Sequence, residues 1–374
     1  MNLTLSVKLV PTAEQHAALL ATMERFNAAC NDIAVVAFRE HSANKVRLQK
    51  LVYTDIRERF GLSAQLTIRA IAKVCEAYKR DKSVQPTFRP HGAVVYDERI
   101  LTWKALDRVS ILSLSGRLVI PVVIGAYQRL RWGRVRGQAD LLYRDGTFYL
   151  QVVVDVTEPP LVEGSDVLGV DLGIVNLAAD SDGETYSGAT VDVKRRHYEK
   201  LRSSLQRVGT KNSRRRLQRI RHRERRFKRD VNHVIAKHLV AKAHDTGRDL
   251  ALEDLSGIRE RTTVKRAQRS RHAKWAFAEL RTFVTYKAVL AGVYVHLVDP
   301  RNTSRQCAVC GHIAPANRPS QAVFKCVSCG HADLADHNAA QNIRARAAAN
   351  RLMASDALLG AVPGASPRLS VVGS

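Results

Sequence analysis

Four cysteines near the C-terminal end of the chain constrain its fold more than any other feature. They form two C-x2-C pairs separated by 15 residues and are Cys307, Cys310, Cys326 and Cys329. Two such pairs supply four thiolates for one tetrahedral Zn²⁺, in a closed site whose role is structural. The spacing therefore predicts a zinc ribbon over residues 306–331 and argues against a disulfide framework.

The charge of the chain indicates a polyanionic partner. There are 60 Lys and Arg against 35 Asp and Glu, which gives a net charge of +25. Contacts of such a chain with phosphates release condensed counterions, so nucleic acid is the expected partner, although charge alone does not distinguish DNA from RNA. The alternative is a solvated basic surface without a partner. We expect no membrane span and no secretion, since the sequence has no long uncharged apolar run and no signal-type start.

The densest basic segment lies between Lys194 and Arg229, where 17 of 36 residues are Lys or Arg and two are Glu. The pattern is helical, with basic residues on every face and a modest apolar seam, so packing on a core does not explain the charge. We interpret the segment as a phosphate-binding helix, and the alternative is a solvated helix. The candidate nucleic-acid-binding residues are Arg214, Arg215, Arg216, Arg219, Arg223 and Arg226.

The first 160 residues predict a small β-barrel with a helical insertion. Residues 3–9 alternate as a half-buried strand, and Thr12 with Gln15 forms a capping box that opens a helical block extending to about residue 82. From residue 86 the chain shows short alternating runs with turns at Ser115-Gly116 and Asp145-Gly146. We assign residues 1–10 and 84–160 to the barrel and residues 11–83 to the inserted helices.

The following region predicts an α/β domain, which makes the whole chain an α+β multidomain protein. Its expected order is three strands, long helices, a strand, a helix and a strand, as in a ribonuclease-H-type sheet, although many α/β domains share so loose an order. We assign residues 161–305 and 332–350 to this domain. Residues 351–374 have little pattern and are expected to form a flexible tail.

Three carboxylates could converge on one divalent metal site. Asp171 interrupts the apolar run "VLGVDLGIV", Glu253 ends the strand "DLALEDL", and Asp336 stands where the helix "ADHNAAQNI" begins. Oxygen ligands of this kind suit Mg²⁺. For Asp336 the alternative is a helix N-cap, and for Glu253 a solvent-facing strand end. Clustered carboxylates in a basic protein indicate phosphodiester hydrolysis, in which two metal ions activate water and stabilise the leaving oxygen.

Five segments in order resemble the motifs of TnpB, the transposon-encoded RNA-guided DNA nucleases related to type V CRISPR effectors. These segments are "GVDLGIVNLA", "LALEDLSGI", "VDPRNTSRQCAVCGH", "FKCVSCGH" and "ADHNAAQNI", and they cover residues 165–345. Asp333 lies three residues before Asp336, but only Asp336 has the D-x-N-A-A-x-N-I context of the family.

The resemblance implies a RuvC-like nuclease domain with the catalytic, Mg²⁺-binding triad Asp171, Glu253 and Asp336, and the zinc ribbon inserted before the third acid. It also implies a wedge barrel interrupted by a helical recognition lobe, a guide RNA, and a double-stranded DNA target recognised beside a short adjacent motif. A prokaryotic cytoplasmic location, with action at the nucleoid, follows from the same resemblance.

Two other functions remain open at this stage. A nuclease-inactive, RNA-guided DNA-binding regulator could use the same scaffold, although it would not need an intact acid triad. A DNA transposase would also use acids and metal, but it would join strands as well as cut them. The sequence leaves the guide RNA, the adjacent motif and the oligomeric state unassigned.

Overall fold

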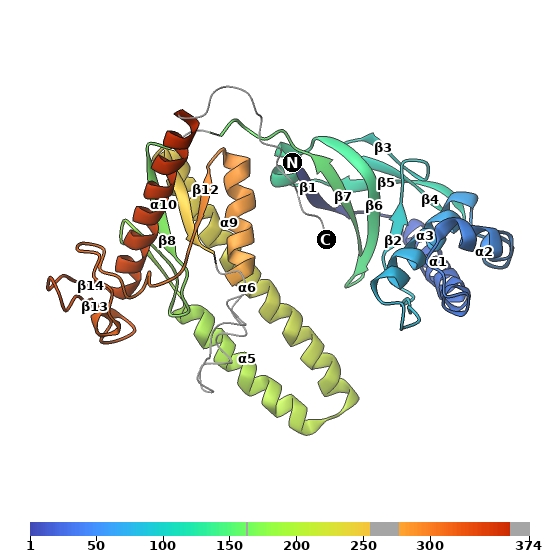
Figure 1. The fold of residues 1–374 in the computed structure, drawn as a ribbon. Helices are drawn as coiled ribbons and strands as arrows, with labels where there is room; N and C mark the ends of the chain where they lie inside the picture. The colour runs from blue at the N-terminus through green and yellow to red at the C-terminus, as the bar shows by residue number, and fades with distance from the viewer. Residues whose placement is uncertain (162–163, 255–276, 360–374) are drawn as a thin grey trace. The chain divides into compact units, whose positions relative to one another are not determined.

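A computed structural model describes residues 1–161, 164–254 and 277–359, and it divides the chain into two compact units (Figure 1). The first unit is Met1–Thr157 and the second begins at Glu158. Residues 351–359 of the predicted tail form the end of helix α10 (Ala335–Leu359). Residues 360–374, and the first residues of the helix predicted near 274–292, lie outside the described residues. Within the described ranges, no helix has the length and apolar character needed to cross a membrane.

The first unit is built on one seven-stranded sheet with the order β2-β6-β7-β1-β5-β4-β3. Its strands are β1 (Asn2–Leu9), β2 (Val94–Tyr96), β3 (Leu101–Ala105), β4 (Arg108–Ser113), β5 (Gly116–Val123), β6 (Arg134–Arg144) and β7 (Thr147–Asp155). The two edge strands, β2 and β3, follow each other in the chain, and the Tyr96 hydroxyl donates to the Leu112 carbonyl of β4 at 3.1 Å. The sheet is therefore barrel-like and nearly closed, with β1 at its centre.

Two predicted turns form the hairpins of this sheet. Asp145 and Gly146 both have positive φ, 48° and 79°, which is the conformation that a two-residue hairpin turn requires. Gly116 (φ 102°) follows the turn between β4 and β5. The Asp-Gly turn therefore lies where the sequence predicts it, whereas the second turn consists of Leu114 and Ser115, one residue earlier than predicted, because Gly116 already pairs with Ser113.

Three helices stand between β1 and β2 in the chain: α1 (Ala13–Arg39), α2 (Lys45–Phe60) and α3 (Ala64–Arg80). The predicted capping box at the start of α1 is confirmed, with reciprocal bonds between Thr12 and Gln15. Buried side chains of the helices, such as Phe26 and Ile33, belong to the same hydrophobic core as the inward-facing residues of β1. A short helix, α4 (Ala126–Leu130), connects β5 to β6.

The second unit contains a five-stranded mixed sheet with the order β10-β9-β8-β11-β12. Its strands are β8 (Asp166–Asp171), β9 (Asn176–Asp180), β10 (Thr185–Ser187), β11 (Arg248–Glu253) and β12 (Val295–Val298). Strands β8, β9 and β10 form an antiparallel meander, and β11 pairs in parallel with both β8 and β12. The described elements follow the order that the sequence predicts.

Helices cover both faces of this sheet, and they are α5 (Ala189–Val208), α6 (Lys211–Asp245), α9 (Phe277–Ala291) and α10 (Ala335–Leu359). Successive side chains of β8 point to opposite faces of the sheet and so contact different helices. Leu168 and Val170 pack with α6 and α9, whereas Val167 packs with Ile343 and Ala347 of α10. Figure 1 shows α10 lying along β8 on the face opposite α6.

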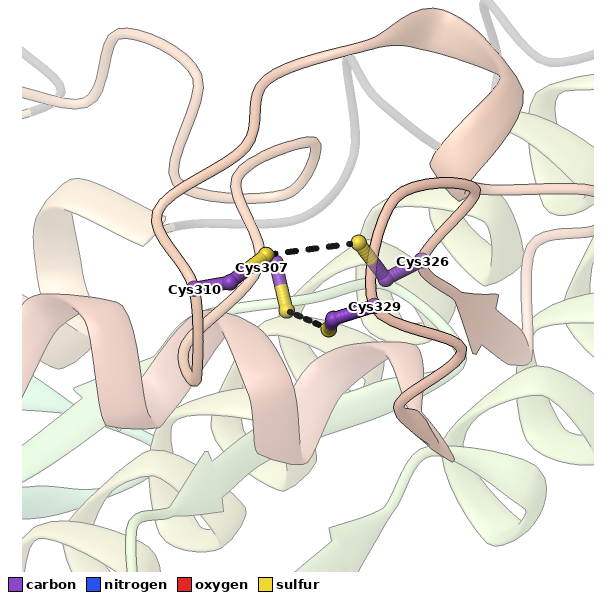
Figure 2. A group of neighbouring side chains, drawn as sticks. All are labelled: Cys307, Cys310, Cys326 and Cys329. Carbon is purple, nitrogen blue, oxygen red and sulfur yellow. Dashed lines mark hydrogen bonds between the residues drawn. The ribbon is translucent and has the colours of Figure 1, made fainter.

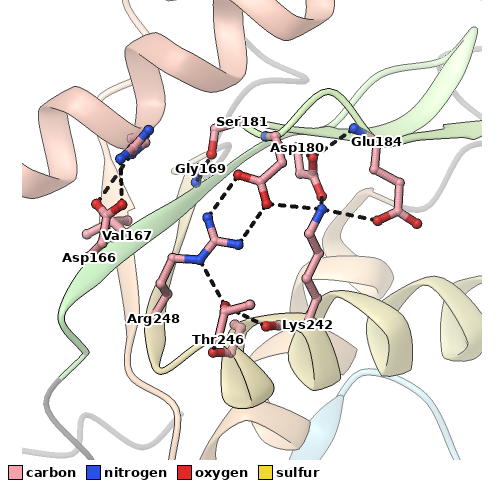
Figure 3. A network of polar contacts seen from close by, with 12 residues as sticks. Asp166, Val167, Gly169, Asp180, Ser181, Glu184, Lys242, Thr246 and Arg248 are labelled. Atoms are coloured by element: carbon pink, nitrogen blue, oxygen red, sulfur yellow. Dashed lines mark hydrogen bonds and ion pairs between the residues drawn. The ribbon is translucent and has the colours of Figure 1, made fainter.

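A network of ion pairs fixes the end of the sheet where β9 turns into β10 (Figure 3). Lys242 of α6 binds Asp180 at 2.5 Å and Asp182 at 3.2 Å, and Arg248 of β11 makes a two-point contact with Asp182. The hydrogen bond from Arg248 holds the pKa of Asp182 well below its usual range. These contacts fasten the meander to α6 and β11.

The segment before α10 forms a small separate substructure. It contains a 3-10 turn (Pro315–Asn317) and the two-stranded antiparallel pair β13 (Val323–Lys325) and β14 (Ala332–Leu334). Its hydrophobic core consists of Cys307, Phe324, Cys326 and Ala335. So small a core supports the sequence argument that a metal ion is needed to hold the segment folded.

Candidate functional site

Asp171 and Glu253 end neighbouring strands at the same edge of the second sheet. Strands β8 and β11 are parallel and pair Val170 with Leu252, so the next residue of each strand is an acid. Burial raises the pKa of Asp171 to about 8, and the charges of Glu253 and Asp336 add to the increase. Asp171 therefore feels the charges of both other predicted acids.

Glu253 is a buried residue, with 8% of its surface exposed. Its Oε1 atom accepts a hydrogen bond from the Thr303 hydroxyl. Burial raises the pKa of Glu253, and the Thr303 bond opposes that increase. The alternative of a solvent-facing strand end is therefore wrong.

Asp336 lies in the first turn of α10, one residue after the start of the helix, so it does not occupy the N-cap position. Its Oδ2 accepts a hydrogen bond from Asn176 Nδ2 at 2.9 Å, and Arg318 Nη2 lies 3.7 Å from its Oδ1. Asp333 instead binds His337 Nδ1 at 2.7 Å. The electrostatic coupling to Asp171 thus involves Asp336, the acid that the sequence motif selects.

The acid cluster has the donor chemistry of a hard-cation site, because all of its ligand atoms are carboxylate oxygens. Like charges raise the pKa of Asp171, and a bound cation would remove that repulsion. The three carboxylates are spread over a wider space than the cysteines. Among the described residues, only the cysteine quartet has three or more potential metal-ligating atoms within 4.8 Å of one another.

The four predicted cysteine ligands do come together (Figure 2). The Sγ atoms of Cys307 and Cys329 are 3.7 Å apart, and those of Cys310 and Cys326 are 3.6 Å apart. A tetrahedral zinc with Zn–S bonds of about 2.3 Å requires sulfur separations of about 3.8 Å, so the quartet fits the ion. The main-chain N–H groups of Cys329 and Ser328 lower the pKa of the Cys326 thiol, a direction that favours the thiolate form that zinc binds.

Two asparagines of α10 attach this cysteine cluster to the sheet domain. Asn338 and Asn342, one helical turn apart, are buried, and both donate to the Gln306 carbonyl, at 2.8 and 2.7 Å. Asn338 Oδ1 also accepts from the Ala308 N–H at 3.0 Å. The N-A-A-x-N spacing therefore places two amides on the one face of α10 that meets the first cysteine pair.

The basic segment forms a hairpin of two helices, α5 and α6, joined at Gly209, whose φ of 68° is left-handed. Buried Glu224 pairs with Arg202 across the hairpin and with Lys228 at 3.1 Å. The buried carboxylate is thus paired with cations of both helices, and one face of α6 does pack, contrary to the even distribution of basic residues in the sequence. All six predicted phosphate-binding arginines are exposed on α6: Arg214, Arg215, Arg216, Arg219, Arg223 and Arg226.

Comparisons with known proteins match the regions that carry these residues. Residues 151–259 match a family model described as a probable transposase, and residues 277–343 match the Cas12f1-like TNB domain. A TnpB-like protein of Methanocaldococcus jannaschii is 36% identical over 108 residues, which is 29% of this chain and 38% of that protein. The putative RNA-guided DNA endonuclease InsQ of Escherichia coli is 29% identical over 222 residues, 54% of each chain.

A longer match decides the assignment. The CRISPR-associated endodeoxyribonuclease Cas12f1 of Sulfoacidibacillus thermotolerans is 31% identical over 301 residues, covering 71% of this chain and 69% of that protein. The chain belongs to the TnpB family, which is related to the type V CRISPR effectors. The resemblance seen in the sequence is thereby confirmed. The chain spans about two thirds of this relative's length and about half or less of the other two.

In this TnpB-family chain, the two matched regions contain the three acids and the four cysteines together. The structure adds three polar residues that the sequence reasoning missed: Thr303, which contacts Glu253, and Asn176 and Arg318, which flank Asp336. Thr303 lies within a quoted motif, but nothing in its spacing indicates a contact with an acid 50 residues earlier. Arg318 lies between the cysteine pairs, where a basic residue has no distinctive pattern.

Proposed function

We propose that this chain is an RNA-guided, Mg²⁺-dependent DNA endonuclease. The observation that carries the proposal is the convergence of Asp171, Glu253 and Asp336 at one edge of the second sheet, within a chain of net charge +25. Carboxylates would repel nucleic acid unless cations lie between them and the phosphates. The E. coli and S. thermotolerans relatives, which are named as a putative RNA-guided DNA endonuclease and an endodeoxyribonuclease, support the same activity.

Asp171, Glu253 and Asp336 would hold Mg²⁺ in a RuvC-like site. The bound Mg²⁺ would supply activation of water and stabilisation of charge at the scissile phosphate. The chain's own groups set up that site. Burial of Glu253 against Thr303 and the Asn176 contact to Asp336 fix two of the carboxylates, and Arg318 adds a positive charge beside them. The mixed five-stranded sheet with helices on both faces supports the ribonuclease-H-type assignment of residues 161–305 and 332–350.

The remaining assignments follow the same proposal. The cysteine quartet would hold one structural Zn²⁺ in a ribbon over residues 306–331, as the sulfur separations support. The barrel-like sheet would be the wedge and α1 to α3 the recognition lobe. The exposed arginines of α6 would bind phosphates of the guide RNA or of a double-stranded DNA target carrying a short adjacent motif. We place this activity in the cytoplasm of a prokaryote, at the nucleoid.

The test begins with the RNA that copurifies with the protein. Its sequence defines the guide, and a plasmid library with a matching target and randomised flanks then reports cleavage in Mg²⁺. We expect the wild-type complex to cut and Asp171→Ala to bind the target without cutting it. Asp333→Asn is the matched control, because this acid binds His337 outside the proposed site, and it should cut normally.

Other outcomes identify the other candidate functions. Guided binding without any cleavage by the wild-type protein would indicate a nuclease-inactive regulator. Joined strand-transfer products would indicate a transposase, the activity in the description of the family model that matches residues 151–259. Cleavage by Asp171→Ala at a rate near that of the wild type would remove the acid triad from the mechanism.

A further inference from the structure

Thr303 connects the acid cluster to the cysteine cluster. The residue is buried, with 3% of its surface exposed, and its hydroxyl donates to Glu253 Oε1. Its carbonyl oxygen accepts from Asn342 Nδ2 of α10 at 2.9 Å. The side chain and the main chain of this one residue therefore contact a proposed metal ligand on β11 and the helix that carries Asp336.

The segment from Thr303 to Cys307 has little freedom to move. It begins in a turn whose first residue, Asn302, has a left-handed φ of 60°, a conformation that Asn tolerates better than most residues. The Arg305 and Gln306 N–H groups both donate to the Asn302 carbonyl, at 2.9 and 2.8 Å. Four residues after Thr303 comes Cys307, the first thiolate of the proposed zinc site.

Hydrogen bonds from α10 hold the other end of this segment. Asn338 and Asn342 both bind the Gln306 carbonyl, and the Ala308 N–H donates to Asn338. A displacement of Cys307 would therefore be transmitted along a short, hydrogen-bonded segment to the Thr303 hydroxyl. No comparable restraint on Glu253 is visible in its own strand, where the described contact of its carboxylate is the one with Thr303.

We propose that Thr303 is a positioning residue, which orients the Glu253 carboxylate for a divalent cation, and that zinc bound by the cysteines keeps Thr303 in place. The inference rests on the proposed nuclease function. A hydrogen bond to one carboxylate oxygen selects one orientation of the group, and outer-sphere contacts of this kind commonly change metal affinity 10- to 100-fold. The competing interpretation is that Thr303 only satisfies a buried carboxylate and contributes to folding.

The first experiment compares Thr303→Val with Thr303→Ser. Valine keeps the branched shape and removes the donor, whereas serine keeps the donor. We expect Thr303→Val to raise the Mg²⁺ concentration for half-maximal cleavage about 10-fold or more, and Thr303→Ser to stay within about 3-fold of the wild type. If valine destabilises the fold, Thr303→Ala, which leaves space for a water beside the carboxylate, provides the second variant and should fall between the two.

A second measurement does not depend on cleavage. Mg²⁺ that binds the folded state should raise the melting temperature of the free protein, and this increase should be smaller in Thr303→Val than in the wild type or Thr303→Ser at the same Mg²⁺ concentration. The matched control is Thr67→Val. Thr67 of α3 is also buried, and its hydroxyl donates to the main-chain carbonyl of Ser63, the N-cap residue of that helix, so its loss should leave the Mg²⁺ response unchanged.

Removal of zinc tests the second half of the proposal. A zinc-selective chelator should raise the Mg²⁺ requirement of the wild type, and it should add little to that of Thr303→Val, because both changes act through one contact. The proposal is overturned if Thr303→Val lowers the melting temperature but leaves both Mg²⁺ responses unchanged, which is the outcome of a purely structural role. If Mg²⁺ raises the melting temperature of the wild type but the protein cuts no DNA, the nuclease function is wrong and the positioning role of Thr303 still holds.

Discussion

Gly169 of β8 packs directly against the main chain of α10 at Ala340. A Cβ atom at residue 169 would come within 2.2 Å of the Ala340 carbonyl oxygen and 2.6 Å of the Arg344 amide nitrogen. Both are main-chain atoms, so they cannot move aside without the helix. The first glycine of "GVDLG" thus permits the close approach between the strand that ends in Asp171 and the helix that begins beside Asp336.

We predict that Gly169→Ala moves α10 away from β8 and lowers DNA cleavage by at least about 10-fold. Overpacking of this kind typically costs about 1–3 kcal/mol, which should appear as a lower melting temperature, and the displaced Asp336 accounts for the loss of activity. Cleavage rates and thermal unfolding measure the two effects. Gly125→Ala is the control, because a Cβ at that position would meet only the end of the Gln128 side chain. Normal cleavage by Gly169→Ala would show that the helix spacing does not set the site.

A second prediction concerns the stability of the metal-free protein. A carboxyl whose pKa is raised to about 8 on folding takes up a proton, so its contribution to stability declines as pH rises from about 4 to 8. Asp171→Asn removes this penalty. The variant should be more stable than the wild type at pH 8 in Mg²⁺-free buffer, by up to about 5 kcal/mol at about 1.4 kcal/mol per pKa unit, and the difference should vanish below pH 4.

Thermal unfolding at pH 5 and pH 8 tests this expectation, with exposed Asp107→Asn as the control acid. Added Mg²⁺ should stabilise the wild type and have little effect on Asp171→Asn. The difference in unfolding free energy between the two proteins at pH 8 should therefore become smaller. If Asp171→Asn were less stable than the wild type at pH 8, the acid cluster would not be the strained site that its electrostatics indicate.

Features encoded locally could be predicted from the sequence. The capping box at Thr12, the Asp145-Gly146 turn and the two C-x2-C pairs each depend on residues a few positions apart, and the structure contains all three. Asp171 could be singled out because a carboxylate in an apolar strand needs a partner. These inferences rest on short-range rules of backbone geometry and burial.

Contacts between distant segments could not be predicted in this way. Asn176 and Asp336 are 160 residues apart, and Thr303 and Glu253 are 50 apart. Each pair meets only because the fold brings separate strands, a helix and a loop together. The basic hairpin also differs from the expected even distribution of charge. Its buried pair, Arg202 with Glu224, could be recognised only once the two helices were aligned.

The third prediction separates charge from base reading in the hairpin. Replacing Arg214, Arg215 and Arg216 with Ala should weaken nucleic-acid binding and flatten its salt dependence, by about 0.9 log units for each lost duplex phosphate contact. The triple Lys variant keeps the charge and should keep the slope. Binding measured at several salt concentrations distinguishes the two. If the salt dependence of binding is unchanged in the Ala variant, these exposed arginines form a solvated face and do not contact phosphates.

A fourth prediction tests the cysteine cluster as a structural metal site. We expect about one zinc per chain, and its loss or weakening in Cys326→Ser, because structural zinc supplies on the order of 10 kcal/mol to units with so small a core. Cleavage should fall although no proposed catalytic ligand is altered. Val327→Ser, at an exposed position beside Cys326, is the control and should retain both zinc and activity. A zinc-free wild type would contradict the assignment.

The last prediction concerns Arg318, which reaches from the cysteine-rich segment to within 3.7 Å of Asp336 and lowers the pKa of Asp171. Removing its charge should raise the pKa of Asp171, so the acidic limb of the pH–rate profile should move toward higher pH. Arg318→Ala should therefore lose more activity near pH 6.5 than near pH 8.5. Arg318→Lys, which keeps a positive charge, should retain more of the wild-type profile. Because Arg318 also donates to the Gln321 carbonyl at 2.8 Å, zinc content must be measured in each variant to exclude damage to the ribbon. A profile of Arg318→Ala that is uniformly lowered at all pH values, with zinc retained, would mean that the arginine acts on the DNA and not through the charge of Asp171.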